Sequence, residues 1–142
     1  MAALEAVVGH PDMVEFVKAT RGTLTFAELK NVIHRNLSGT RLMMFLKFDL
    51  GEILQKETGL DTPKIVRFLI GNPLIMKEMI KHIPDAGSYA PVTILVAERS
   101  DGVHLSYDKM ASLLAPYKNQ GALVVARDLD SKIECLLRES VV

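Results

Sequence analysis

Two segments of this chain are apolar at positions that point to both faces of a strand, and this pattern limits the folds open to it. In 40–48, Met43 and Phe45 alternate with Leu42, Met44 and Leu46, and in 91–98, Leu95 and Ala97 alternate with Val92, Ile94 and Val96. Because successive side chains of a strand point to opposite faces, both faces of such strands need a cover. Helices of the same chain can cover one face. We expect the other face to meet a second subunit, the amino-terminal segment or an apolar ligand, since a contiguous exposed apolar patch favours association.

The length of the chain and its hydrophobic pattern predict one α+β domain. With 142 residues, 49% of them hydrophobic, the chain is long enough to bury a core without disulfide bonds. We interpret residues 1–12 as an amino-terminal extension and residues 13–142 as the domain. Predicted strands lie at 13–20, 40–48, 64–70, 91–98 and 103–107, and predicted helices at 25–38, 50–58, 73–83 and 120–138. The expected architecture is a mixed, mostly antiparallel sheet of about five strands, with two long helices packed on one face and a short extra helix.

Capping and turn residues support these boundaries. Thr25 and Glu28 have the spacing of a capping box at the start of the first predicted helix. Asn72 can cap the helix that begins at Pro73, because proline at the first helical position loses no hydrogen bond. The dipeptide Asp101-Gly102 between two apolar segments predicts a β-hairpin.

The charge balance and the single cysteine argue against several classes of protein. Seventeen Lys and Arg residues balance seventeen Asp and Glu residues, so no long-range field draws the chain to nucleic acid or to anionic membranes. The amino terminus has neither a cationic start nor a long apolar run, and we therefore expect no signal peptide and no membrane anchor. Cys135 has no partner for an internal disulfide. We expect a packed thiol in a cytoplasmic protein.

One run of residues resembles the domain of unknown function 302 family. The resemblance is carried by 68–73 (Phe-Leu-Ile-Gly-Asn-Pro) before a methionine-bearing helix, by Ala86-Gly87, and by the hairpin that ends in 103–107 (Val-His-Leu-Ser-Tyr). It extends from about Met13 to the last helix. The resemblance implies an α+β fold related to the TATA-box-binding-protein-like folds and a protein that is usually dimeric. It implies no settled activity and no set of catalytic residues.

Six polar residues near predicted helix and strand ends are candidates for ligand binding. Asn72 stands at a helix amino terminus, where free backbone amides attract anions, although the same residue also forms an ordinary cap. A polar cluster after that helix supplies a proton donor, an acceptor and hydroxyls: His82, Asp85, Ser88 and Tyr89. His104 lies in the last strand, where alternation places it on the opposite face from Tyr107. Short polar clusters also form turns, so each residue keeps a purely structural interpretation.

No motif in the sequence specifies a reaction, a metal or a cofactor. There is no glycine-rich phosphate loop, no Gly-x-Ser-x-Gly elbow and no His-Glu-x-x-His, and core packing explains the seven methionines better than haem or soft-metal binding does. Our first hypothesis is a homodimeric small-ligand-binding or structural module with no cofactor and a small apolar or anionic ligand. The alternative is a small enzyme, or a cofactor- or haem-carrying protein, that uses the Asn72 corner and the 82–89 loop.

Overall fold

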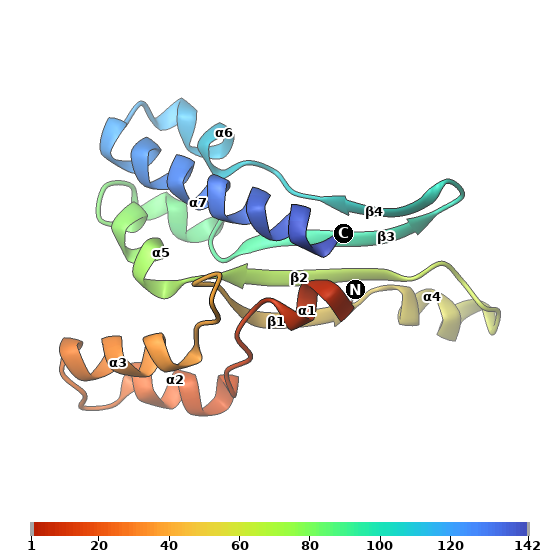
Figure 1. Cartoon of the computed structure of the whole chain (residues 1–142), viewed down its shortest axis with the longest axis horizontal. Helices are drawn as coiled ribbons and strands as arrows, with labels where there is room; N and C mark the ends of the chain where they lie inside the picture. The colour runs from red at the N-terminus through yellow and green to blue at the C-terminus, as the bar shows by residue number, and fades with distance from the viewer. Residues whose placement is uncertain (1, 142) are drawn as a thin grey trace.

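The computed structural model describes residues 2–141, in which four strands form one antiparallel sheet with several helices packed on one of its faces (Figure 1). The strands, in their order across the sheet, are β1 (Met43–Asp49), β2 (Ile65–Gly71), β3 (Val92–Arg99) and β4 (Gly102–Ser106). Each neighbouring pair is antiparallel. The predicted α+β fold is confirmed, with four strands in place of about five.

The missing strand is the segment 13–20, which the structure places in helix α2 (Met13–Arg21). Asp12 caps this helix, because its carboxylate accepts hydrogen bonds from the backbone N–H groups of Val14 at 3.0 Å and Glu15 at 3.2 Å. Phe16 is its one buried residue among those described, while Val14 is 65% exposed. The strand prediction was wrong because β-branched residues were weighted above the capping aspartate.

The other helices are α1 (Ala2–Ala6), α3 (Phe26–Asn36), α4 (Gly51–Thr58), α5 (Pro73–Ile80), α6 (Met110–Leu114) and α7 (Gln120–Ser140), with 3₁₀ turns η1 (Pro84–Ser88) and η2 (Ala115–Tyr117). Helices α3, α4, α5 and α7 begin within about one residue of their predicted starts, whereas α1 and α6 were not predicted. Thr25 accepts a hydrogen bond from the backbone N–H of Glu28 at 3.2 Å, and Asn119 caps α7 in the same way. The turn η1 lies largely in the predicted 82–89 loop, and α6 and η2 lie in the segment 108–118, for which the sequence analysis predicted no element.

The main core lies between one face of the sheet and the helices α1, α5, α6 and α7 (Figure 1). The residues that β2 and β3 contribute to it are Val66, Phe68, Ile70, Val92, Ile94 and Val96, all buried. From α7 the contribution is the apolar stripe that the sequence predicts, and Ala122, Ala126, Leu129, Ile133 and Leu136 are all buried there. A smaller core cluster joins α2 and α3 to Met43 and Phe45 at the start of β1.

A β-bulge in β1 changes which of its side chains face the helices. The register of β1 against β2 shifts between Met44 and Leu46, so that Leu46 pairs with Leu69 and Lys47 pairs with Phe68. A regular strand would have placed Leu46 on the same face as Met44, as we predicted. The bulge instead turns Lys47 toward the helices, where its Nζ lies 2.7 Å from Glu5 of α1.

The amino-terminal segment is part of the main core in this structure. Leu4 and Val8 are buried with the residues of β2, β3 and α7. Gly9 forms an isolated parallel bridge with Met43, and its backbone N–H donates to the carbonyl oxygen of Leu42 at 2.9 Å. The segment therefore lies on the helix-covered side of the sheet and leaves the other face open.

Replacing Gly9 by alanine tests this contact. The added Cβ would lie 1.8 Å from the carbonyl oxygen of Asn36, so the backbone would have to move. We expect Gly9→Ala to lower the free energy of unfolding by about 2 kcal/mol or more in urea denaturation. Gly39→Ala is the matched control, because a Cβ there meets nothing within 4 Å. Equal stability of the two variants would contradict the packing of the amino-terminal segment.

Candidate ligand groove and open sheet face

The face of the sheet that α1, α5, α6 and α7 leave uncovered is called here the open face. The register assigns to it Leu46, Phe48, Ile65, Arg67, Leu69, Thr93, Leu95, Ala97, His104 and Ser106. Leu46 is 47% exposed and Phe48 is 46% exposed, although both are large apolar side chains. Because directly opposed residues of antiparallel strands are neighbours, the pairs Leu46–Leu69 and Arg67–Leu95 join these side chains into one surface.

A groove of about 400 Å³ adjoins the open face between the sheet, η1 and the chain that follows β4. Its lining consists of Arg67, Ser88, Tyr89, Pro91, Val92, Thr93, Leu95, Ser106, Tyr107, Asp108 and Leu113. Such a volume is in the usual range for small-molecule sites. The groove combines apolar walls with several hydroxyl groups and one charge of each sign, so it suits a small ligand with a polar end.

Arg67 is the cation of this groove and is solvent-exposed. Its Nε donates a hydrogen bond to the hydroxyl of Thr93 at 3.1 Å. No carboxylate of the described residues lies within ion-pair distance of it. The guanidinium is therefore oriented by a neutral group and keeps its charge available.

Tyr107 lies at one side of the groove and forms a part-buried hydrogen bond. Its hydroxyl donates to the carboxylate of Asp130, a buried residue of α7. The same carboxylate accepts the backbone N–H groups of Met110 at 2.8 Å and Ala111 at 3.0 Å, so it caps the start of α6. Burial, together with the hydrogen bond to Asp130, raises the pKa of Tyr107 well above its ordinary value.

Two of the six candidate residues line the groove, and a third lies next to it. Ser88 and Tyr89 belong to the lining. The pKa of Tyr117 is raised to about 12. The largest cause is a hydrogen bond with Tyr89, and burial and the negative charge of Asp85 add to it. Asp85, Tyr89 and Tyr117 are therefore neighbours at one end of the groove.

The structure gives Asn72 and His82 contacts elsewhere. The side-chain oxygen of Asn72 accepts the backbone N–H of Leu74 at 2.9 Å, and its nitrogen donates to the carbonyl oxygen of Arg41 at 3.1 Å. Arg41 has a positive φ of 61°, in the left-handed region. Asn72 therefore has two structural roles: it caps α5, and it hydrogen-bonds to this left-handed residue. His82 lies against Gly121 near the start of α7, where a Cβ would come within 2.6 Å of its ring. A ligand role for either residue stays a prediction.

His104 lies on the open face near the β3–β4 turn. Its Nε2 lies 2.6 Å from the carboxylate of Asp101, and this hydrogen bond is the main reason that the pKa of Asp101 is lowered. His104 is not among the residues that line the groove. The six candidate residues therefore do not converge on one point.

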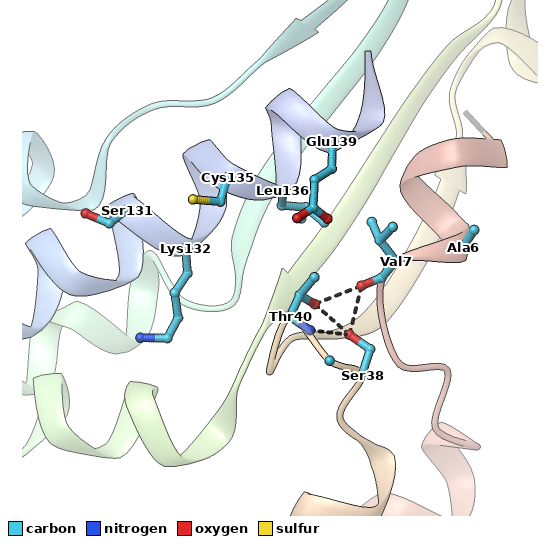
Figure 2. Close-up of a pocket in the computed structure, with 10 residues that line it drawn as sticks. Ala6, Val7, Ser38, Thr40, Ser131, Lys132, Cys135, Leu136 and Glu139 are labelled. Atoms are coloured by element: carbon cyan, nitrogen blue, oxygen red, sulfur yellow. Dashed lines mark hydrogen bonds between the residues drawn. The ribbon is translucent and has the colours of Figure 1, made fainter. Parts of the chain in front are cut away.

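A second cleft, of about 510 Å³, lies between α7, the end of α1 and the turn at 38–40 (Figure 2). The hydroxyls of Ser38 and Thr40 both donate to the carbonyl oxygen of Val7 at 2.8 Å, as Figure 2 shows. Lys132 pairs with Asp128 at 2.5 Å. Most polar groups of this cleft are thus engaged by the chain itself.

Cys135 lines this second cleft and is exposed. The prediction of a packed thiol was therefore wrong. The helical period places residue 135 beside the buried stripe of α7, next to Leu136, and the side chain falls on the solvent side of that stripe.

Within residues 2–141, no three His, Cys, Asp or Glu side chains are grouped as a metal site would require. A search of the same residues finds no helix with the length and hydrophobicity needed to cross a bilayer.

Sequence reasoning did not identify Arg67, Thr93, Ser106 or Asp108 as site residues. Arg67 carries a usable signal, because it is the only charged residue within the apolar strand 65–71. The others belong to β3, β4 and the segment after it, and only the pairing of the strands brings them to Arg67.

Comparisons with known proteins agree on one family. The model of a family described as domain of unknown function DUF302 matches residues 17–140. A solved structure titled as an uncharacterized conserved DUF302 protein from Bacillus stearothermophilus is similar to this chain, with 17% sequence identity and a TM-score of 0.62, over 94% of each chain. At that identity the likeness shows the fold alone. No curated protein matches the sequence significantly.

The raised pKa of Tyr107 predicts a loss of stability in alkali. Its phenol ionises more readily in the unfolded chain, so the folded state is favoured below about pH 10 and loses that advantage as the pH rises further. We expect Tyr107→Phe to cost about 1–3 kcal/mol at neutral pH and to flatten the fall of unfolding free energy above about pH 10. Val124→Ala, at a position of α7 that is 63% exposed and carries no titratable group, is the control and should keep the alkaline profile of the wild type. An unchanged alkaline profile in Tyr107→Phe would contradict the hydrogen bond between Tyr107 and Asp130.

Proposed function

This chain belongs to the domain of unknown function DUF302 family, and from that premise we propose that it is a homodimeric small-ligand-binding module without catalytic machinery of its own. Two copies associate through the open face, and the groove beside this face holds the ligand. The single observation that carries the proposal is the exposure of large apolar side chains on the open face.

The physical argument is the cost of leaving this face in water. Leu46 and Phe48 are about half exposed; Leu46 is paired with Leu69, and Phe48 is paired with Arg67, whose other neighbour across the strands is Leu95. Burying apolar surface contributes about 25 cal/mol for each Å² removed from water, so covering this patch favours association. Scattered apolar residues are normal on a surface, but a contiguous patch in a sheet marks an interface.

A second copy of the chain is a suitable cover for this face. The chain has no net charge, so two copies meet without long-range repulsion. Most homodimers use one patch that contacts itself around a two-fold axis, and a sheet face of mixed apolar and polar residues fits that arrangement. The neutral charge also gives no support to nucleic acid as a partner.

The groove at the edge of this interface is where we place the ligand. Its hydroxyl groups and its apolar wall suit a small molecule more than an extended polymer. A reducing compartment, the cytoplasm, agrees with the exposed thiol of Cys135.

Substitutions on the open face test the dimer. We expect the wild-type chain to be a dimer by light scattering across the micromolar range, and Leu46→Lys with Phe48→Lys to weaken association at least about tenfold for each substitution. Both side chains are already about half exposed, so the variant should remain folded. Val124→Lys, at a position of α7 that is 63% exposed, is the control and should remain dimeric. A wild-type monomer, or a dimer that tolerates both lysines, would refute association through the open face.

A further inference from the structure

The groove beside the open face contains a cation for which residues 2–141 provide no anionic partner, and we propose that Arg67 anchors a small monocarboxylate with an apolar or aromatic body. This inference rests on the part of the proposed function that makes the groove a binding site. It adds the chemical class of the ligand.

The nearest neighbours of Arg67 on the open face, directly across the strands and along its own strand, are apolar. Across the strands it is paired with Phe48 of β1 and Leu95 of β3. Along its own strand, the next side chains on the same face are Ile65 and Leu69. A guanidinium among four apolar neighbours has only the Thr93 hydroxyl as a described protein partner.

This placement constrains whatever covers Arg67. A charge that is removed from water without an opposite charge costs several kcal/mol, whereas a hydrogen-bonded pair offsets much of that cost. A second subunit or a ligand that seats here must therefore bring an anion or leave the guanidinium wet. The adjoining groove allows a ligand to bring that anion.

The geometry of the side chain favours a carboxylate. The hydrogen bond from Nε to the Thr93 hydroxyl uses the one donor on the inner edge of the guanidinium. The two terminal nitrogens are then left to donate in parallel, which is the arrangement that a carboxylate accepts as a bidentate pair.

The charges of the groove favour a single negative charge over two. Arg67 is the one cationic side chain of the lining, and Asp108 adds a negative charge. Phosphate sites in proteins commonly combine several donors with a helix amino terminus or a second cation. A dianion in this groove would meet one positive charge and one repelling carboxylate.

The rest of the groove lining is suited to a ligand with an apolar body. Pro91, Leu95 and Leu113 supply aliphatic surface, and Tyr89 and Tyr107 supply aromatic rings. A volume of about 400 Å³ accommodates a short fatty acid or an arylalkanoic acid.

The test compares two carboxylates with ligands that carry another polar group or no apolar body. Hexanoate and 3-phenylpropanoate are titrated into the full chain, with hexanol, hexylamine and inorganic phosphate as comparators, and binding is followed by calorimetry and by amide chemical shifts of the groove residues. We expect both carboxylates to bind and to shift the amides of Thr93 and Ser106. Hexanol, hexylamine and phosphate should each bind at least about tenfold more weakly.

Variants of Arg67 assign the effect to the guanidinium. Arg67→Gln should weaken hexanoate binding at least about tenfold. Arg67→Lys should be intermediate, because it keeps the charge but loses the bidentate geometry. Arg99→Gln, at the exposed end of β3 and outside the groove, is the matched control and should bind like the wild type. Urea denaturation checks that each variant is folded.

Each contrary result overturns the inference. If carboxylates bind Arg67→Gln as tightly as the wild type, Arg67 is not the anchor. If hexanol binds as tightly as hexanoate, the groove does not require a negative charge. If phosphate binds more tightly than the carboxylates, the groove is a phosphate site and the proposed ligand class is wrong. Light scattering separates this test from that of the dimer: a dimer that binds no carboxylate refutes this inference alone, and a monomer that binds hexanoate through Arg67 refutes the dimer alone.

Discussion

The pairing of β2 with β3 is the interaction on which the rest of the structure depends. Val66 lies opposite Val96, and Phe68 lies opposite Ile94, with all four side chains buried under the helices. This double row gives α5 and α7 a continuous apolar surface to pack on. The same alternation sends Arg67 and Leu95 to the opposite face. Formation of the core and exposure of the candidate site are thus two results of one strand register.

The bulge in β1 separates the two faces of the sheet at its edge. By adding one residue to the strand, it turns Lys47 toward Glu5 and sends Leu46 and Phe48 to the open face. The amino-terminal segment, with Leu4 and Val8 buried, then covers the helix side of the same edge. The bulge therefore gives Lys47 an ion-pair partner on the covered side of the sheet and adds apolar surface to the open face.

The groove and the cleft beside α7 differ in how their polar groups are used. In the cleft beside α7, the hydroxyls of Ser38 and Thr40 are bound to Val7, and Lys132 is paired with Asp128. In the groove, Arg67 has a neutral partner. An internally satisfied cleft holds the fold together, whereas an unneutralised cation beside apolar walls is suited to a ligand. This contrast, more than volume, distinguishes the groove as the candidate site.

The sequence by itself determined the elements that depend on local chemistry, because caps and alternation act between residues close in the chain. Thr25 and Asn72 mark their helices correctly, and β2, β3 and α7 follow from their apolar periods. The strand predicted at 13–20 was wrong, because the helix cap formed by Asp12 outweighed the strand preference of the β-branched residues. Only the tertiary structure decided the bulge at Phe45, the burial of the amino-terminal segment and the meeting of Arg67 with Thr93. Each of these depends on contacts between distant parts of the chain, and no local pattern encodes their register.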